Sequence, residues 1–205
     1  SASAIIGGLI LSRSLVVSGA DRMSDNDVLT LATEMEGHPD NVAAALHGGA
    51  VLAWTGNEFA DAIKLEVSPR ISAVAFIPSN HVPTSKARKL LPETIPHLDA
   101  VKNSANTALL TQALTNRPDL LLTATTDYLH QSYRESAMPK SFALMQKLRA
   151  AGVAAFISGA GPTVLALLVD ADLNHELADL VRAAGSGFEV ENLDISRVGY
   201  QVSNI

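Results

Sequence analysis

The chain lacks cysteine and is poor in aromatic residues, in positive charge and in long apolar runs. Without cysteine it can form neither disulfides nor thiolate metal sites, which fits a cytoplasmic protein. Its 15 Lys and Arg residues face 21 Asp and Glu residues, giving a net charge of −6, so we expect no nucleic-acid partner. The apolar run at residues 4–11 is too short to span a bilayer, and no cationic segment precedes it. We therefore expect a soluble protein with no targeting signal and no membrane partner.

The composition favours two lobes whose cores consist of small aliphatic side chains. Hydrophobic residues make up 47% and aromatic residues only 4% of the 205 positions, so Ala, Val, Ile and Leu must build the core. Because domains commonly contain roughly 100 to 150 residues, we expect two lobes. The SPR stretch at residues 68–70 is the predicted boundary, which divides the chain into residues 1–67 and 68–205.

Helix and strand patterns are mixed along both lobes. In the first lobe they predict a helix near residues 1–15, a helix from Ser24 or Asp25 to Gly37, a helix from Pro39 to Gly48, and strands at 50–54 and 63–67. In the second they predict a strand at 71–78, helices within 94–147 that are separated by Pro118 and Pro139, strands at 153–158 and 163–169, a helix at 175–184, and β structure at 187–202. Since these elements do not alternate strictly as βαβ units, the predicted class is α+β.

Four polar residues surround the junction of the second and third predicted helices: Glu36, His38, Asp40 and Asn41. Helix capping or a solvated helix end accounts for each of them taken separately. Taken together, they suit a magnesium ion and a hydroxyl substrate, because Mg²⁺ usually takes one or two carboxylates and leaves its other positions to phosphate and water. The amides at the helix start would add positive potential.

Two further features could bind anions. The segment SGAGPT at residues 158–163 reads as a tight turn between strands, yet its glycines and open amides would also let it approach a phosphate or a substrate. Thr84 and Arg88 share one face if their segment is helical. Arg88 and Arg134 are either solvated or converge on a small carboxylate, which guanidinium groups bind with two parallel hydrogen bonds. The remaining histidines lack metal-ligand spacing and are expected to be structural or at the surface: His47, His81, His97, His130 and His175.

The motifs EGHPDNV followed by GG, VPTSKAR, YRE and SGAGPT occur in this order across nearly the whole chain. As an ordered set they resemble the GHMP superfamily of small-molecule kinases, most closely its homoserine kinase family. The first residues, SASAIIGGL, are similar to the tail of the family's GLGSS phosphate-binding motif, so we expect a kinase that is truncated within this motif. The resemblance implies an N-terminal lobe of the ribosomal protein S5 domain 2-like type at residues 1–67, a ferredoxin-like lobe at 68–205, and an active site between them.

The resemblance also implies a reaction and a role for each matching residue. The reaction is ATP-dependent phosphorylation of L-homoserine to O-phospho-L-homoserine, on the route to threonine, in a cytoplasmic homodimer with Mg²⁺. Glu36, Asn41 and Arg88 would be catalytic, and Ser1 and Glu36 would hold the metal. ATP would meet Ser1, Ala2, Ser3, Gly159 and Ala160. Homoserine would meet His38, Asp40, Asn41, Thr84, Arg88, Arg134 and Gly161.

Two alternatives stay open at this point. Another GHMP kinase, such as a mevalonate-pathway enzyme, would share most of these motifs. In mevalonate kinase an Asp serves as the base where this chain has Asn41, which leaves the catalytic base unassigned here. A non-catalytic fragment or binding module of the same fold would explain the missing GLGS, and we expect the residues given to be inactive by themselves.

Overall fold

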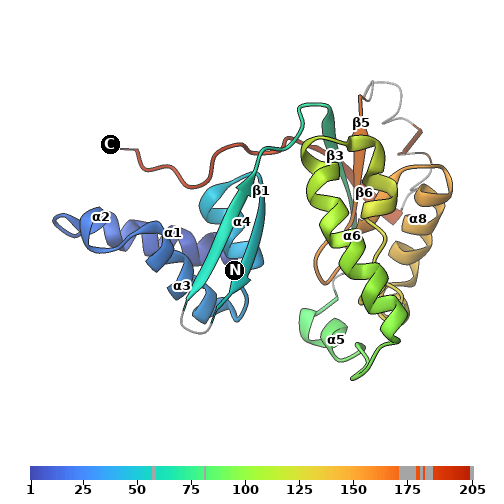
Figure 1. The fold of residues 1–205 in the computed structure, drawn as a ribbon, viewed down its shortest axis with the longest axis horizontal. Helices are drawn as coiled ribbons and strands as arrows, with labels where there is room; N and C mark the ends of the chain where they lie inside the picture. The colour runs from blue at the N-terminus through green and yellow to red at the C-terminus, as the bar shows by residue number, and fades with distance from the viewer. Residues whose placement is uncertain (57–58, 81, 171–178, 181, 183–186, 204–205) are drawn as a thin grey trace. The chain divides into compact units, whose positions relative to one another are not determined.

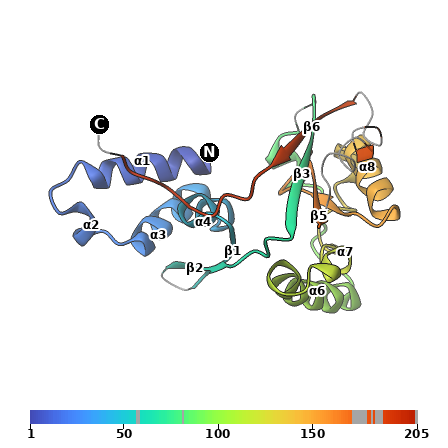
Figure 2. The same ribbon diagram turned by 90° about the horizontal axis from the view of Figure 1, so that it is seen from above.

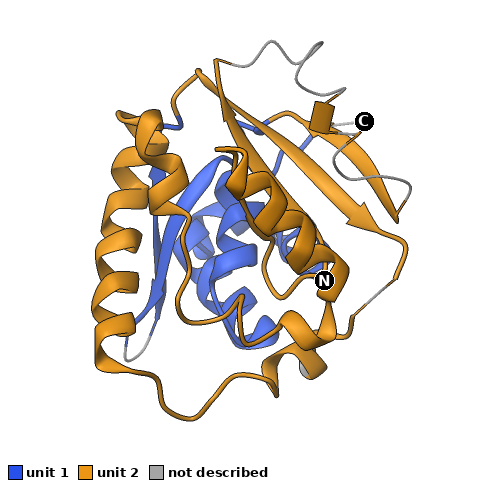
Figure 3. Cartoon of the chain, turned by 90° about the vertical axis from the view of Figure 1, so that its right-hand side faces the viewer, with its two compact units in different colours: residues 1–67, 195–205 blue, residues 68–194 orange. Residues whose placement is uncertain are grey.

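The chain divides into two units between Val67 and Ser68 (Figure 3). The structure, a computed structural model, describes residues 1–56, 59–80, 82–170, 179–180, 182 and 187–203 (Figure 1). Unit 1 comprises residues 1–67 and 195–205, and unit 2 comprises residues 68–194. Residues 195–205, which the sequence analysis assigns to the second lobe, thus group with the first. That these units are the two lobes of a kinase remains a prediction.

Unit 1 consists of helices packed on a two-stranded hairpin. Its elements are α1 (Ala2–Ser14), α2 (Gly19–Arg22), α3 (Asp25–Glu36), α4 (Asp40–His47), β1 (Ala50–Thr55) and β2 (Ala60–Leu65). The strands pair antiparallel, with Leu52 opposite Ile63. Aliphatic side chains from α1, α3 and α4 and from β2 form one core: Ile6, Ile10, Val28, Leu29, Ala32, Val42, Ala43, Leu46 and Ala60.

Local sequence signals set the ends of α3 and α4. The Ser24 side chain accepts a hydrogen bond from the Asp27 amide, and the Asp27 carboxylate accepts one from the Ser24 amide, so α3 begins with a capping box. Gly37, at a φ of 89°, and Gly48, at a φ of 67°, end the two helices in conformations that favour glycine. The helices predicted here are confirmed, whereas β2 begins three residues before its predicted start and α2 was not predicted.

The last described residues join unit 1 through hydrogen bonds. The Gly49 amide donates to the Ser196 carbonyl at 2.5 Å, and the Tyr200 amide donates to the Leu46 carbonyl at 3.3 Å. The Arg13 guanidinium donates to the Tyr200 hydroxyl at 2.6 Å. These bonds explain why the C-terminal segment groups with unit 1. The β structure predicted for residues 187–202 is therefore wrong beyond Leu193, since only Phe188–Leu193 forms a strand, β6.

Unit 2 is built on an antiparallel sheet with the order β4-β5-β3-β6. Its strands are β3 (Ile71–Pro78), β4 (Ala154–Ile157), β5 (Val164–Val169) and β6, and its helical segments are α5 (Thr84–Arg88), α6 (His97–Thr115), η1 (Pro118–Leu120), α7 (Leu121–Ala124), η2 (Glu135–Ala137) and α8 (Pro139–Ala150). This strand order and direction are those of a ferredoxin-like sheet. Most of the helix predicted at 175–184 lies outside the described residues.

The core of unit 2 lies between the sheet and α8. Phe142, Met145 and Leu148 of α8 join Val74 and Phe76 of β3 in one cluster. Pro118 and Pro139 each begin a new helical segment, as predicted, because proline lacks the amide that a helix interior needs. α6 and α7 lie side by side (Figure 2). None of the helices within the described residues combines the length and hydropathy required to cross a membrane.

Candidate active site

The predicted metal residues meet at the N-terminus of α1. The Ser1 hydroxyl lies 2.8 Å from both carboxylate oxygens of Glu36, which is the last residue of α3. Ser1 is the N-cap of α1, and Ala2 and Ser3 form its first turn, where backbone amides have no partner within the helix. The structure therefore brings a hydroxyl, a carboxylate and a helix N-terminus together, a donor set that suits Mg²⁺ and phosphate.

The other three polar residues of unit 1 gather at the start of α4. The Asp40 Oδ1 atom lies 2.5 Å from His38 Nδ1 and accepts a hydrogen bond of 2.6 Å from the Asn41 backbone amide. Only Gly37 separates His38 from Glu36 in the sequence. The carboxylate of Asp40 thus fixes the imidazole beside the helix start, and the Asn41 side chain lies in an exposed position next to it.

The predicted arginines lie in unit 2 and influence each other. Thr84 and Arg88 are the first and last residues of α5, and both are exposed. Arg134 has only 8% of its surface exposed, and its Nη1 donates a 3.0 Å hydrogen bond to the Gly159 carbonyl. Burial lowers the pKa of Arg134, the charge of Asp127 raises it, and the positive charge of Arg88 lowers it further. Arg134 Nε is buried with no hydrogen-bond partner among the described residues.

The turn at residues 158–163 connects β4 to β5 and contacts Arg134. It closes through a 2.9 Å hydrogen bond from the Ser158 amide to the Thr163 carbonyl, and the Gly161–Pro162 peptide bond is cis. Gly159 and Gly161 have positive φ values of 56° and 81°. A Cβ at Gly161 would lie 2.4 Å from the Met138 sulfur, so the Met138 side chain would have to shift to admit it, and the φ of 81° favours glycine there as well. Ala160 packs against the core of unit 2.

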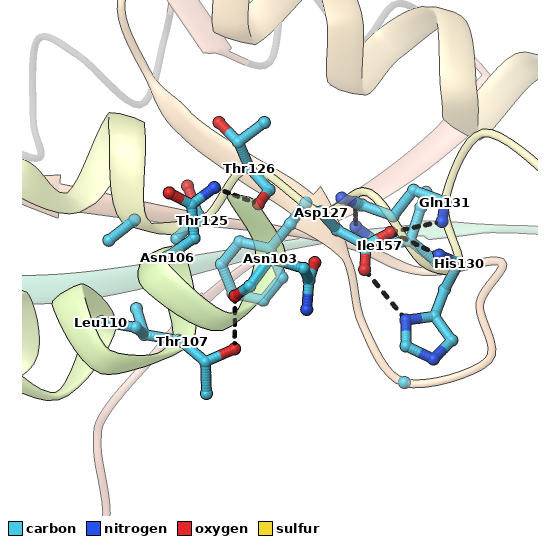
Figure 4. A pocket seen from close by; sticks show the side chains of 13 residues that line it. Asn103, Asn106, Thr107, Leu110, Thr125, Thr126, Asp127, His130, Gln131 and Ile157 are labelled. Atoms are coloured by element: carbon cyan, nitrogen blue, oxygen red, sulfur yellow. Dashed lines mark hydrogen bonds and ion pairs between the residues drawn. The ribbon is translucent and has the colours of Figure 1, made fainter. Parts of the chain in front are cut away.

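Asp127 and Gln131 are not among the site residues predicted from the sequence. They line a cavity of about 220 Å³ with His130, Asn103, Asn106 and other residues (Figure 4). His130, expected to be structural, bonds Asp127 through Nδ1 at 2.9 Å, while His81 and His175 lie outside the described residues. The position of Asp127 just before a turn could have indicated its role, because an Asp that precedes a turn commonly accepts hydrogen bonds from the following backbone amides.

Comparison with known proteins identifies the family. Residues 108–187 match the family described as GHMP kinases C terminal. The homoserine kinase of Streptomyces avermitilis is 47% identical over 98% of this chain, and that of Streptomyces coelicolor is 49% identical over 98%. Among solved structures, the homoserine kinase of Cytophaga hutchinsonii aligns with a TM-score of 0.75 and 28% identity over 86% of this chain and 60% of that one.

The match runs through nearly the whole chain but not through the whole of its relatives. The chain spans 65% and 64% of the length of the two Streptomyces proteins, just under two thirds. The predicted α+β fold of the GHMP kinases is confirmed. With this level of identity, the match at residues 108–187 and the structural alignment, the chain belongs to the homoserine kinase family of the GHMP kinases.

Proposed function

We propose that the full-length protein transfers the γ-phosphoryl group of ATP to the hydroxyl of L-homoserine. The hydroxyl oxygen would form the new bond to phosphorus, and the bond from the γ-phosphorus to the β–γ bridging oxygen would break. ADP would leave with that electron pair, and the hydroxyl proton would pass to solvent water. The observation that carries the proposal is the buried guanidinium of Arg134, close to a second cation, in a chain whose relatives are homoserine kinases. Mevalonate also carries a carboxylate, so the choice of homoserine over a mevalonate-pathway substrate rests on the identity of the relatives.

The two arginines would bind the substrate carboxylate. Arg134 uses Nη1 to reach the Gly159 carbonyl, and its buried Nε has no hydrogen-bond partner among the described residues. Arg88 lies close enough for its charge to lower the pKa of Arg134. Two cations held near each other favour an anion between them, and a guanidinium edge matches the geometry of a carboxylate. Thr84, on the same short helix as Arg88, would lie near the substrate hydroxyl.

Ser1 and Glu36 would hold Mg²⁺ at the ATP phosphates. Their contact at 2.8 Å provides one carboxylate and one hydroxyl, which fits a metal that takes few protein ligands. When bound, the ion would neutralise charge on the phosphoryl group that is transferred. Ala2 and Ser3 in the first turn of α1, with Gly159 and Ala160 in the turn at residues 158–163, would contribute amides to the phosphates.

The start of α4 would receive the reacting end of homoserine. His38, Asp40 and Asn41 would contact homoserine, as would Gly161 of unit 2, and Asn41 would lie near the attacking hydroxyl. An amide is not a base, but phosphoryl transfer passes through a loose transition state that depends chiefly on positioning and charge neutralisation. The proposal therefore requires orientation from Asn41 instead of proton abstraction. A cytoplasmic location and a homodimer belong to the same proposal, through the family resemblance.

The test is an ADP-release assay of the full-length protein with homoserine, mevalonate and shikimate in parallel. Homoserine should be phosphorylated with the highest kcat/KM. Arg134→Ala should raise the KM for homoserine about 10- to 100-fold, the loss expected for hydrogen bonds between charged groups. Glu36→Gln should lower kcat about 100-fold, because it removes charge needed mainly in the transition state.

Two controls make the assay specific. Arg70→Ala removes a guanidinium of the same unit that bonds Asp170, so it should leave the KM for homoserine unchanged. 3-Amino-1-propanol lacks the carboxylate of homoserine, so the Arg134→Ala penalty should disappear with this substrate. A penalty of equal size for both substrates would contradict the role of Arg134, and a preference for mevalonate would contradict the proposed reaction.

A further inference from the structure

Asp127 organises the turn that carries Arg134. Its Oδ2 accepts hydrogen bonds from the backbone amides of His130 at 2.8 Å and Gln131 at 2.6 Å, and its Oδ1 lies 2.9 Å from His130 Nδ1. The amide of Arg134 in turn donates to the carbonyls of His130 and Gln131, each at 3.2 Å. One carboxylate therefore determines the backbone path that leads to the guanidinium.

Gln131 attaches the same turn to the sheet. Its Oε1 accepts a buried 2.6 Å hydrogen bond from the amide of Ile157, the last residue of β4. Two residues further along, the Gly159 carbonyl receives the Nη1 hydrogen bond of Arg134. Two hydrogen bonds therefore join the segments. Gln131 bonds Ile157 at the strand end, and Arg134 bonds Gly159 in the following turn.

The cavity beside this turn means that hydrogen bonds, more than packing, hold the arrangement. Asp127, Gln131, Ile157 and Gly159 all border the space of about 220 Å³ (Figure 4). A side chain next to such a space has fewer van der Waals neighbours to fix it. If one of the hydrogen bonds is removed, the turn has room to shift toward the cavity, and the guanidinium direction shifts with it.

We propose that Asp127 and Gln131 are positioning residues that aim the Arg134 guanidinium at the substrate carboxylate. This inference rests on the proposed function of Arg134. A guanidinium binds a carboxylate well only when one planar edge faces it, so a small rotation loses one of two parallel bonds. Neither Asp127 nor Gln131 needs to touch the substrate, and the effect of each would pass through Arg134.

The test compares disruptive and conservative variants of the full-length protein in the same ADP-release assay. Gln131→Met and Asp127→Ala remove the acceptors and should each raise the KM for homoserine about tenfold, with the KM for ATP unchanged and kcat within about threefold, because misplacement of a binding group weakens recognition. Gln131→Glu and Asp127→Asn retain an acceptor oxygen and should stay within about threefold of the unmodified protein. Asp170→Asn, which weakens the remote Arg70 ion pair in the same unit, serves as the matched control.

A double-mutant cycle separates positioning from general destabilisation. If Gln131 acts through Arg134, Gln131→Met should have no further effect on the KM for homoserine once Arg134 is Ala. Additive effects, or an equal rise in KM for homoserine and ATP, would overturn the inference. The inference would also be overturned if Arg134→Ala raised the KM for homoserine but Gln131→Met and Asp127→Ala left it unchanged. In that case the proposed function of Arg134 would stand. If Arg134→Ala itself leaves the KM unchanged, the role of Arg134 and this inference are overturned together.

Discussion

Replacing Gly161 with alanine should destabilise the protein much more than the same change at Gly159, two residues earlier. Both glycines adopt left-handed backbone conformations, with φ values of 81° and 56°. An added Cβ at Gly159 meets no atom within 4 Å, whereas at Gly161 it would lie 2.4 Å from Met138 Sδ, 2.7 Å from Met138 Cε and 2.9 Å from Ile157 Cγ2. The pair therefore separates backbone strain from steric overlap within one turn.

The expected magnitudes follow from these distances. A left-handed conformation costs a non-glycine residue about 1–2 kcal/mol, which applies at both positions. Overlap in a packed core adds about 1–3 kcal/mol. Met138 and Ile157 are 4% and 6% exposed and belong to the core of unit 2, so neither can move into solvent. We expect about 1–2 kcal/mol for Gly159→Ala and about 2–5 kcal/mol for Gly161→Ala.

Urea denaturation followed by circular dichroism measures the difference. The midpoint should fall further for Gly161→Ala with an unchanged m-value, since m depends on the surface exposed on unfolding. Met138→Ala opens space for the new methyl group, so it should cost less stability in the Gly161→Ala background than in the unmodified protein. Equal destabilisation by the two alanines at positions 159 and 161, or an equal cost of Met138→Ala in both backgrounds, would refute the steric explanation.

Two other predictions concern single contacts. Burial raises the pKa of Asp127, but hydrogen bonds from the His130 side chain and from the Gln131 and His130 amides lower it more, to about 2. The ionised Asp127 therefore stabilises the fold by about 2 kcal/mol above about pH 4, and this stabilisation is lost as the pH falls toward 2. The free energy of unfolding, measured against pH, should vary less over this range in Asp127→Asn than in the unmodified protein. An identical pH dependence would contradict this assignment. The Tyr200 hydroxyl accepts from Arg13 at 2.6 Å and donates to Asp25 at 3.1 Å. Tyr200→Phe should thus cost about 1–2 kcal/mol in thermal or urea unfolding, and no loss would show that these bonds do not stabilise unit 1.

Local signals in the sequence were sufficient for much of the fold. Ser24 with Asp27 and Gly37 define α3, and the apolar run at residues 71–78 coincides with β3, because capping and hydrophobic patterning act over a few residues. The same reasoning failed for residues 194–202. Their sequence resembles a strand, but their hydrogen bonds go to Leu46, Gly49 and Arg13, at the other end of the chain.

The sequence by itself determined the family, the α+β class and the residue types available for chemistry, since ordered motifs and periodicity are properties of the chain alone. Only the tertiary structure decided which of those residues meet. It placed Ser1 against Glu36 and Arg134 against Gly159, and it revealed Asp127 and Gln131 behind Arg134. The physical reason is that burial, cavities and hydrogen bonds between segments distant in sequence depend on how the chain packs, which no local pattern records.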